Sequence, residues 1–254
     1  MPQAENSRLL KYWLTRSLQR ANGIQYDAPI DYRRALKYGL PDGVPELYAA
    51  GNFGIDTDLF PPSAERIPGH IVFPRGRAES ANGAGFVRAV ELLKHHSQLR
   101  FTAIGLKGIS YAEKAASDPM LTNRLVLTPR LSREAFAEVL ATADVVVSPT
   151  FTDGTPNSIL EALACGVTVV AGNIPSIANL QSEVGVMTLF EHGSDEEVAA
   201  AILGSVGRPP TVVRLPEHYS IHSNQARVLD FYDGAIRHHS GPNKVGDEMD
   251  QSRA

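Results

Sequence analysis

The chain has 254 residues, of which 43% are hydrophobic and 20% are charged, and its formal net charge is −4. These values are ordinary for a compact globular protein. The sequence has no run of about eighteen apolar residues, which a transmembrane helix needs, and its first residues lack the apolar stretch of a secretory signal. We therefore expect a cytoplasmic protein that does not span a membrane.

The predicted elements form two groups along the chain. The first twenty residues are predicted to be helical, residues 23–26 a short strand, and residues 32–38 a helix that Gly39 ends. Residues 41–62 are rich in Gly and Pro and are predicted to be an irregular linker. From His70 onward strands and helices alternate, with strands near 71–73, 101–105, 124–127, 144–148, 167–171 and 184–189, and helices near 84–97, 132–142, 156–165 and 194–206.

This alternation predicts an α/β fold with a Rossmann-like, doubly wound parallel sheet and right-handed crossovers. Residues 222–239 are predicted to form a final helix with one apolar side. Residues 240–254 are polar and lack periodicity, and we expect them to be disordered.

Charge is distributed unevenly. Residues 1–41 carry seven basic and three acidic side chains, whereas the whole chain is acidic. A nucleic-acid partner is not expected, because the chain has no basic stretch interleaved with aromatic residues. The apolar residues of the basic segment have helical spacing (Leu9, Leu10, Trp13, Leu14, Leu18). We prefer to interpret them as a stripe that packs on the rest of a domain, and the alternative is peripheral contact with an anionic membrane face.

Cysteine and histidine usage predicts neither a disulfide nor a metal centre. The single Cys165 lies in an apolar helical pattern and is interpreted as a buried structural thiol. The eight histidines have no zinc-ligand spacing with partner cysteines. We expect no metal ion and no cofactor.

The segment from Val145 to Ala171 is the most informative part of the sequence. It reads as a strand, a polar loop, a helix rich in Leu and Ala, and a second strand, so the loop lies where open α/β sheets bind ligands. We predict Thr155 as the N-cap of the helix and Pro156 as its first residue. The free amides of Asn157 and Ser158 would then form a phosphate site.

Two carboxylates accompany this phosphate site. Glu161 lies roughly 6 to 8 Å along the helix axis from its start, at 1.5 Å per residue. A carboxylate there could accept hydrogen bonds from the ribose of the same nucleotide. Asp153 lies in the loop and is predicted to be free to reach a second polar group.

The string S-P-T-F-T-D-G-T-P-N-S-I-L-E-A-L-A-C-G resembles the donor-site signature of family 4 glycosyltransferases, which have the GT-B fold. Residues 54–61 resemble the family's interdomain linker, and 101–105, the T-A-D-V-V-V-S-P run and 184–186 follow the family's order. The resemblance places Asp153 and Glu161 at the family's two acidic positions, although the first is usually Glu. It implies that Asp153 contacts the donor sugar, with Glu161 on the ribose.

The resemblance also implies a second phosphate-binding element. The family has G-R-x4-K-G after the first strand of its donor domain, and here Gly76-Arg77 match while Asn82 replaces the lysine. Arg75 is a candidate to compensate for the missing charge. The implied diphosphate site consists of Arg75, Arg77, Asn82, Gly154, Thr155, Asn157 and Ser158. The loop that follows the third strand is implied to bind the nucleoside (Thr128, Pro129, Arg130, Leu131).

On this resemblance, residues 68–206 are the nucleotide-sugar-binding domain, and residues 1–67 are a remnant of the amino-terminal acceptor domain plus the linker. Residues 207–239 are a carboxy-terminal segment with a closing helix. Most of the acceptor domain is then absent, so we expect that another chain supplies the amino-terminal half or that the gene start is mis-set.

The implied function is transfer of a sugar from a nucleotide-diphosphate-sugar to a hydroxyl of an acceptor sugar, lipid or small molecule, in polysaccharide or glycolipid biosynthesis. The family retains anomeric configuration and needs no metal ion. Two alternatives stay open: a nucleotide-sugar-binding subunit without catalysis, and a nucleotide-sugar epimerase or hydrolase of the same fold.

Overall fold

The computed structural model describes residues 7–49, 53–191 and 194–239. The chain divides into two compact units, and each is described by itself. The sheet unit is Ile55–Pro216, and the split unit combines Met1–Gly54 with Glu217–Ala254. No helix in the described ranges is long and apolar enough to cross a membrane.

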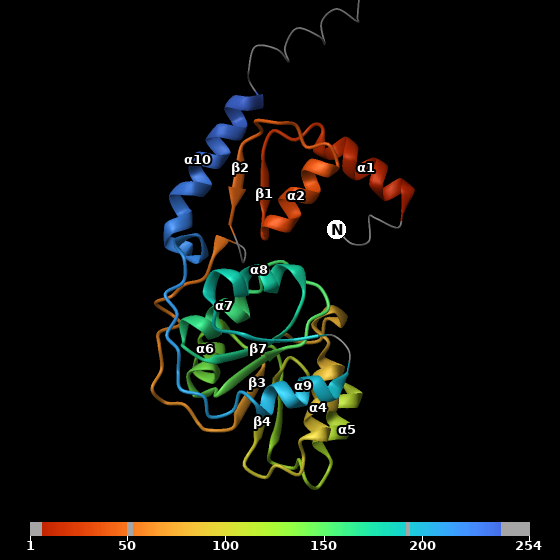
Figure 1. Ribbon diagram of the computed structural model, residues 1–254, viewed down its shortest axis with the longest axis vertical. Coiled ribbons are helices and arrows are strands. Elements are labelled where there is room, and N and C mark those ends of the chain that lie inside the picture. The colour runs from red at the N-terminus through yellow and green to blue at the C-terminus, as the bar shows by residue number, and fades with distance from the viewer. Residues whose placement is uncertain (1–6, 50–52, 192–193, 240–254) are drawn as a thin grey trace, which may run out of the picture. The chain divides into compact units, whose positions relative to one another are not determined.

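The sheet unit contains one six-stranded parallel sheet in the order β5-β4-β3-β6-β7-β8 (Figure 1). Its strands are β3 (His70–Phe73), β4 (Arg100–Ile104), β5 (Leu125–Thr128), β6 (Val145–Ser148), β7 (Thr168–Gly172) and β8 (Thr188–Phe190). In the register, Ile71 of β3 lies between Phe101 of β4 and Val145 of β6. The first strand of the unit is therefore central, and the order reverses between β3 and β6, which is the Rossmann arrangement.

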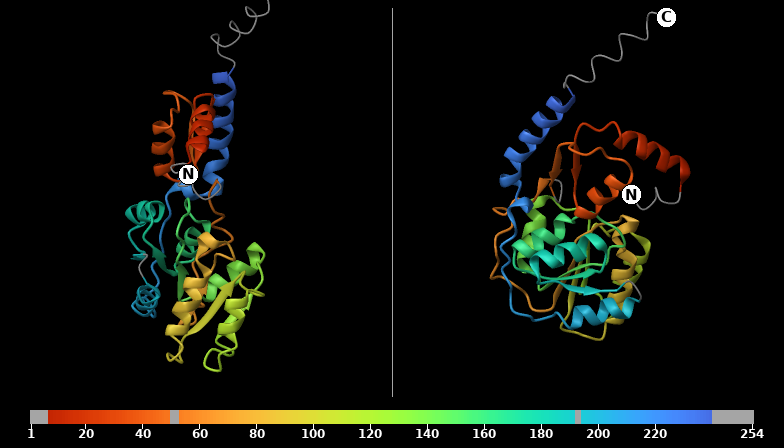
Figure 2. Two further views of the ribbon diagram at one scale, coloured as in Figure 1. Left: turned by 90° about the vertical axis from the view of Figure 1, so that its right-hand side faces the viewer. Right: turned by 45° about the horizontal axis from the view of Figure 1, so that its top comes forward.

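Helices cover both faces of this sheet (Figures 1 and 2). The helices of the unit are η2 (Glu79–Ala81), α4 (Gly83–Leu92), α5 (Ser110–Ala116), α6 (Arg133–Thr142), α7 (Asn157–Ala164), α8 (Pro175–Val184) and α9 (Asp195–Leu203). α4, α5 and α9 share one buried core with Ile71, Phe73 and Phe101. Neighbouring side chains alternate between the faces of a sheet, so Val72 points to the other face, where α6 packs on β3 and α7 packs on β6 and β7. The predicted doubly wound α/β fold is confirmed.

The strands predicted near 71–73, 101–105, 124–127, 144–148 and 167–171 match β3 to β7 to within one residue at each end, but other predictions were wrong. The strand expected near 184–189 begins only at Thr188, because α8 continues to Val184 and ends with Gly185 in the left-handed conformation. α5 and α8 were not predicted. α5 has only seven residues, so its periodic signal is weak. α8 has ten residues, and the helical spacing of Ile177, Leu180 and Val184 was missed.

The split unit contains α1 (Arg8–Leu18), β1 (Ile24–Tyr26), α2 (Pro29–Lys37), β2 (Glu46–Tyr48), η3 (Glu217–Tyr219) and α10 (Ile221–His239). β2 pairs in parallel with β1, so the prediction that 41–62 is wholly irregular was wrong. The strand has only three residues and follows Pro45, which hides it from pattern analysis, and stacked Tyr26 and Tyr48 rings 5.4 Å apart support the pairing. Trp13 is 59% exposed, whereas Leu18 packs against a small core formed by Ala35, Leu40 and Val44.

The predicted final helix is confirmed as α10. It packs against the start of β1, since a Cβ on Gly23 would lie 2.9 Å from the Phe231 ring. The predicted disordered tail, 240–254, lies outside the described residues.

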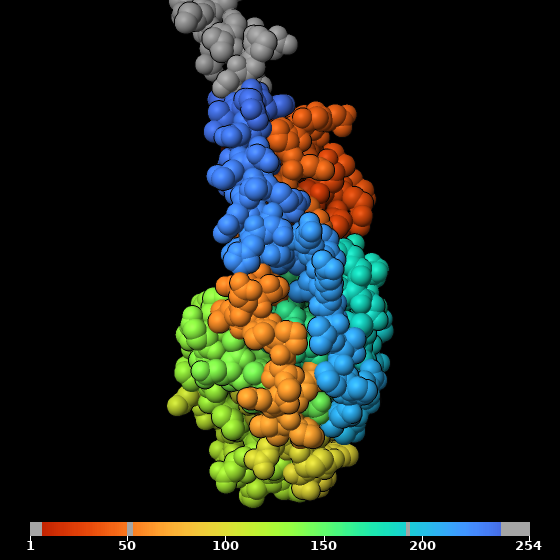
Figure 3. Space-filling view, turned by 90° about the vertical axis from the view of Figure 1, so that its left-hand side faces the viewer, coloured from red at the N-terminus to blue at the C-terminus, as the bar shows by residue number. Residues whose placement is uncertain are grey.

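Two irregular segments of the sheet unit, 55–67 and 207–216, lie side by side on its surface (Figure 3). Ile67 donates its amide to the Thr142 carbonyl at 3.0 Å. Buried Asp144 accepts hydrogen bonds from the amides of Gly69 at 2.8 Å and Gly207 at 3.0 Å. These bonds attach both segments to the amino-terminal end of β6.

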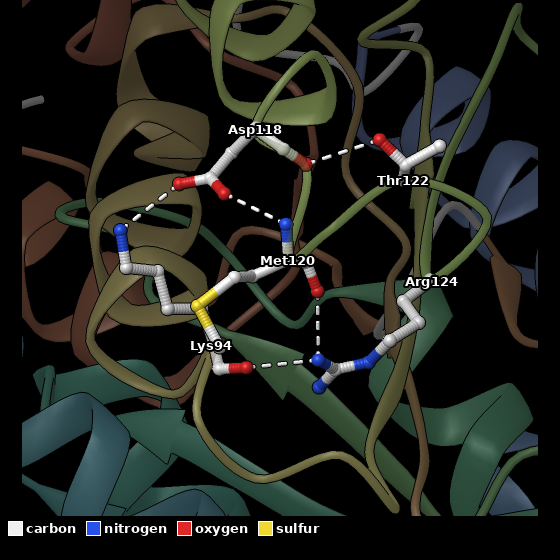
Figure 4. A network of polar contacts seen from close by, with 5 residues as sticks. All are labelled: Lys94, Asp118, Met120, Thr122 and Arg124. Atoms are coloured by element: carbon white, nitrogen blue, oxygen red, sulfur yellow. Dashed lines mark hydrogen bonds and ion pairs between the residues drawn. The ribbon is translucent and has the colours of Figure 1, made fainter.

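Arg124 joins three segments at the amino-terminal end of β5 (Figure 4). Its guanidinium donates to the carbonyls of Lys94 and Met120 at 2.8 Å each, and also to those of His96 and Leu99. Lys94 in turn binds Asp118 at 2.9 Å. This cluster stabilises the end of the sheet opposite the strand carboxyl ends, where ligands bind in this fold.

Candidate functional site

The carboxyl ends of β3 and β6 lie at the point where the strand order reverses, which is the usual ligand position in open α/β sheets. The loop after β3 carries Arg75, and the loop after β6 carries Asp153. Their side chains form an ion pair across this point and are each about one-fifth exposed. Asp153 was predicted to reach a second polar group from its loop, and in the structure its side chain reaches Arg75.

Two glycines shape the edge beside this ion pair. Gly76 and Gly105 have φ angles of 73° and 78°, in the left-handed region that favours glycine. A Cβ on Gly105 would lie 2.6 Å from the Gly76 Cα, and the Gly76 amide donates to the Ile104 carbonyl at 3.1 Å. The loops after β3 and β4 therefore pack backbone against backbone, which leaves the arginine side chains to line the space above them.

A pocket of about 560 Å³ occupies this space. Three arginines line it, Arg75, Arg77 and Arg130, together with Pro74, Gly76, Ile104 and Gly105, and none of these residues is acidic. Guanidinium groups bind phosphate oxygens through paired hydrogen bonds. The pocket thus suits a phosphorylated ligand, and it brings together two residues predicted for the diphosphate and one predicted for the nucleoside.

The amino terminus of α7 adds polar groups. Pro156, not Thr155, is the N-cap: its carbonyl accepts from the amides of Ile159 at 3.1 Å and Leu160 at 3.3 Å. The predicted cap was therefore one residue too early, because Pro156 keeps an extended ψ of 120°. Asn157 and Ser158 are consequently the first two helical residues, and first-turn amides have no acceptor within a helix.

Several side-chain atoms around this helix end are buried without a partner. Within the described residues, the Oγ atoms of Ser148 and Ser158 and the Oδ1 atom of Asn157 have no hydrogen-bond partner. The Nε atom of Arg75 is in the same situation. Buried polar groups are nearly always hydrogen-bonded in native proteins. Their grouping at one edge of the sheet indicates a site that a polar ligand completes.

The loop between β6 and α7 is held by side chains and backbone. The Thr150 hydroxyl and the Phe151 amide both donate to the Ser80 carbonyl, at 2.8 and 2.9 Å. The Ser176 hydroxyl donates to the Asp153 carbonyl at 2.9 Å. In this loop Gly154 is half-buried, and burial raises the pKa of the Asp153 carboxyl while Arg75 and the Gly154 amide lower it. The carboxylate is thus partly desolvated and preoriented.

Glu161 lies one turn further along α7 and is 3% exposed. Its Oε1 lies 3.0 Å from a guanidinium nitrogen of Arg133, the first residue of α6. Burial raises the pKa of Glu161, and Arg133 opposes this shift. Burial also raises the pKa of the neighbouring Cys165 thiol to about 11, which confirms the predicted buried cysteine. Sequence reasoning missed Arg133, since nothing in its local pattern shows that α6 and α7 meet there.

Asn82 lies elsewhere. It is the N-cap of α4, with a φ angle of 55°, and its Oδ1 accepts from the Gly85 amide at 3.1 Å. It lines a smaller pocket of about 140 Å³ with Arg88 and Asp195, not the arginine pocket. The structure therefore does not bring Asn82 together with the three arginines.

The loop predicted for the nucleoside begins at the end of β5. The Thr128 carbonyl accepts from the amides of Gly105 at 2.9 Å and Lys107 at 3.1 Å, which ties this loop to the end of β4. The Thr128 hydroxyl donates to the Pro129 carbonyl at 3.0 Å. Leu131 is half-buried, and Arg130 extends into the arginine pocket.

Comparisons with known proteins give matches to glycosyltransferases. The family model described as Glycosyl transferases group 1 matches residues 71–206. A D-inositol 3-phosphate glycosyltransferase of Paenarthrobacter aurescens is 30% identical over 165 residues, covering 56% of this chain and 39% of the relative. An MMP alpha-(1->4)-mannosyltransferase of Mycolicibacterium hassiacum is 23% identical, covering 76% and 49%. The chain thus spans less than half the length of these two curated relatives.

Solved structures show the same fold. HepE of Anabaena in complex with UDP and glucose has a TM-score of 0.63 at 16% identity, covering 94% of this chain and 67% of that one. Sucrose-phosphate synthase of Thermosynechococcus elongatus has the same TM-score and identity, covering 94% and 62%. The neighbours are GT-B glycosyltransferases, and the sheet described above is the donor half of that fold. Because the family model matches more than half of the chain and covers the sheet and the arginine pocket, the chain belongs to the group 1 glycosyltransferases.

Proposed function

We propose that this chain transfers a sugar from a nucleoside diphosphate sugar to an acceptor hydroxyl group. The observation that carries the proposal is the pocket lined by three arginines, without an acidic residue, where the strand order reverses. Membership of the family supports the reaction class. The two curated relatives are themselves named as a glycosyltransferase and a mannosyltransferase.

The pocket accounts for stabilisation of the leaving group. In the transfer, the bond between the anomeric carbon and a diphosphate oxygen breaks, and negative charge grows on the departing diphosphate. Arg75 and Arg77 line the pocket, and the amides of Asn157 and Ser158 begin α7. Preorganised donors at the position of developing charge are a large term in catalysis. We assign the diphosphate to these groups.

Arg75 takes the role that the family gives to a lysine. Asn82 is engaged in capping α4, whereas Arg75 lines the pocket and keeps a buried Nε without a partner within the described residues. Its terminal nitrogen pairs with Asp153. A bound diphosphate would compete with Asp153 for this guanidinium, which links phosphate binding to the position of the carboxylate.

The donor sugar and the nucleoside are assigned to the remaining groups. Asp153 is the carboxylate nearest the reversal point, and we assign it to the donor sugar. Glu161 is assigned to the ribose hydroxyls, while Thr128 and Leu131 with Arg130 form the base site at the end of β5. Gly154 and Thr155 supply the backbone that leads into α7.

The resemblance further predicts membership of family 4, retention of configuration and independence from metal ions. It also predicts an acceptor that is a sugar, lipid or small molecule, and an amino-terminal half that is supplied separately. Contact with the inner membrane face is a further prediction. An epimerase or hydrolase is not favoured, because both curated relatives are named as transferases.

A donor-turnover assay tests the proposal. The chain is incubated with UDP-, GDP- and ADP-sugars, with and without a panel of sugar and lipid acceptors, alone and with the amino-terminal half of a group 1 relative. We expect nucleoside diphosphate release that depends on an acceptor and matches glycosylated product. Release without an acceptor would identify a hydrolase, and donor binding without release under every condition would identify a binding subunit. As a control, Arg100→Ala removes an exposed arginine at the start of β4 that does not line the arginine pocket, and it should release the diphosphate as the wild type does.

A further inference from the structure

Arg133 and Glu161 form an ion pair that connects the start of α6 with the middle of α7. The side chain of Glu161 is 4% exposed, and that of Arg133 is 52% exposed. One partner is thus a buried carboxylate and the other a half-exposed cation. This ion pair therefore differs from a surface ion pair, in which both side chains are hydrated.

The guanidinium of Arg133 is held on more than one side. It lies over the ring of Phe60 at 5.3 Å from the centroid, and Phe60 is 1% exposed. Phe60 in turn packs edge-on against Phe136, which lies in α6 like Arg133, and the two ring centroids are 6.1 Å apart. Ser132 caps α6 by accepting from the Ala135 amide at 3.2 Å. The ring and the capped helix end fix the direction in which Arg133 reaches Glu161.

Arg133 counteracts the effect of burial on the pKa of Glu161. Burial disfavours the charged form of Glu161, and Arg133 is the group that opposes burial. An ionised carboxylate only accepts hydrogen bonds and has about four lone-pair positions, so one bond to Arg133 leaves capacity for two hydroxyl donors. A neutral carboxyl would carry a proton of its own and would match a pair of vicinal hydroxyls less well.

We propose that Arg133 is a positioning residue that orients Glu161, so that the carboxylate selects donors with free ribose hydroxyls. The proposal rests on the proposed function, because it needs a nucleotide in the site. It adds a residue that acts through Glu161 and makes ribose recognition depend on the contact between α6 and α7.

The test compares affinities for three kinds of probe by titration calorimetry. They are the four common ribonucleoside diphosphates, the 2′,3′-dideoxy form of each, and inorganic pyrophosphate. For the wild type we expect the best ribonucleoside diphosphate to bind about 10- to 100-fold more tightly than its dideoxy form, as for hydrogen bonds to a charged group. Glu161→Gln should lower this ratio of affinities, and Arg133→Gln should lower it to a similar value. Pyrophosphate affinity should change less than about twofold in Arg133→Gln.

Two further variants separate positioning from a general structural role. Arg133→Lys should restore part of the ratio, because a lysine keeps the charge without the planar fork. Adding Arg133→Gln to Glu161→Gln should change the ratio no further, since the neutral pair leaves nothing to position. If Arg133→Gln alone does not fold, this neutral pair still allows the comparison, as it leaves no buried charge unpaired.

The outcomes distinguish this proposal from the proposed function. A wild type that binds ribonucleoside diphosphates and their dideoxy forms equally would overturn the role of Glu161 and Arg133, but would leave the donor site intact. An unchanged ratio in Arg133→Gln would make the pair merely structural. If Arg133→Gln lost pyrophosphate affinity and nucleotide affinity equally, Arg133 would be a phosphate ligand instead. A wild type that binds none of the probes would overturn both proposals.

Discussion

The guanidinium of Arg75 and the carboxylate of Asp153 pair directly across the two strands, β3 and β6, between which the sheet reverses its order. One partner lines the arginine pocket, and the other belongs to the loop that leads into α7. A diphosphate that enters the pocket therefore competes with Asp153 for Arg75. The pair compensates the charges of these two side chains.

We expect Asp153→Asn to bind nucleoside diphosphates several-fold more tightly than the wild type and to lose sugar transfer. The substitution releases Arg75 and removes a negative charge beside the phosphates, but it also removes the carboxylate assigned to the sugar. Calorimetry and the turnover assay measure the two effects. Asp195→Asn, which breaks the Arg88–Asp195 pair away from the arginine pocket, is the control and should change neither. Weaker binding in Asp153→Asn would contradict the competition.

Gly105→Ala should destabilise the protein more than Gly108→Ala. Both glycines have φ angles near 80°, so each alanine meets the left-handed penalty of about 1–2 kcal/mol. Only at Gly105 would the Cβ also meet the Gly76 backbone, at 2.6 Å, while nothing lies within 4 Å at Gly108. We expect an additional loss of about 1–3 kcal/mol for Gly105→Ala, measured by urea unfolding. Equal losses would show that the two loops separate without cost.

Asn82→Lys tests whether restoring the family's lysine helps binding. The substitution removes the side-chain oxygen that caps α4 and places a lysine at a φ angle of 55°, so we expect a loss of about 1–2 kcal/mol of stability. Asn82→Asp keeps an acceptor and should lose less than about 0.5 kcal/mol. Since Asn82 does not line the arginine pocket, nucleoside diphosphate affinity should stay the same. Clearly tighter binding in Asn82→Lys would place residue 82 at the phosphates.

The stability of Glu161→Gln relative to the wild type should rise as pH increases above the pKa of an unfolded glutamate. Burial raises the pKa of Glu161 above that of an unfolded glutamate, about 4.3. Between these values the folded state holds a proton that the unfolded state has released, so the wild type loses stability as pH rises through this window. Glutamine does not titrate and escapes this loss.

Urea unfolding at several pH values measures this difference. Glu138→Gln, which removes an exposed carboxylate from α6, controls for the loss of one charge. A relative stability of Glu161→Gln that falls with rising pH would mean that Arg133 outweighs burial.

The sheet and the start of the site could be predicted because their signals are local. The β-branched run of 145–147 identifies a buried strand, and the polar loop before Leu160 identifies the helix whose amino terminus faces the ligand edge. The family resemblance added Arg77 and Glu161 by position. Thr155 and Pro156 are adjacent candidates for one cap, so the error of one residue reflects the limited precision of cap signals.

The partners of the charged residues could not be predicted, because they depend on contacts between distant parts of the chain. Arg75 meets Asp153 only after β3 and β6 become neighbours in the sheet. Arg133 meets Glu161 only after α6 and α7 pack on the same face. The seven-residue helix α5 and the three-residue strand β2 present too few periodic residues to be recognised.

The most direct test of the central claim is titration calorimetry of a nucleoside, its monophosphate and its diphosphate on the wild type, Arg77→Ala and Arg100→Ala. We expect the wild type to bind one diphosphate with 1:1 stoichiometry. Arg77→Ala should weaken the diphosphate by about 1.5–3 kcal/mol, the range for a hydrogen bond to a charged group, and leave the nucleoside nearly unchanged. Arg100→Ala should match the wild type for every ligand. Equal losses for nucleoside and diphosphate in Arg77→Ala, or no binding of any nucleoside diphosphate to the wild type, would contradict a donor site at the arginine pocket.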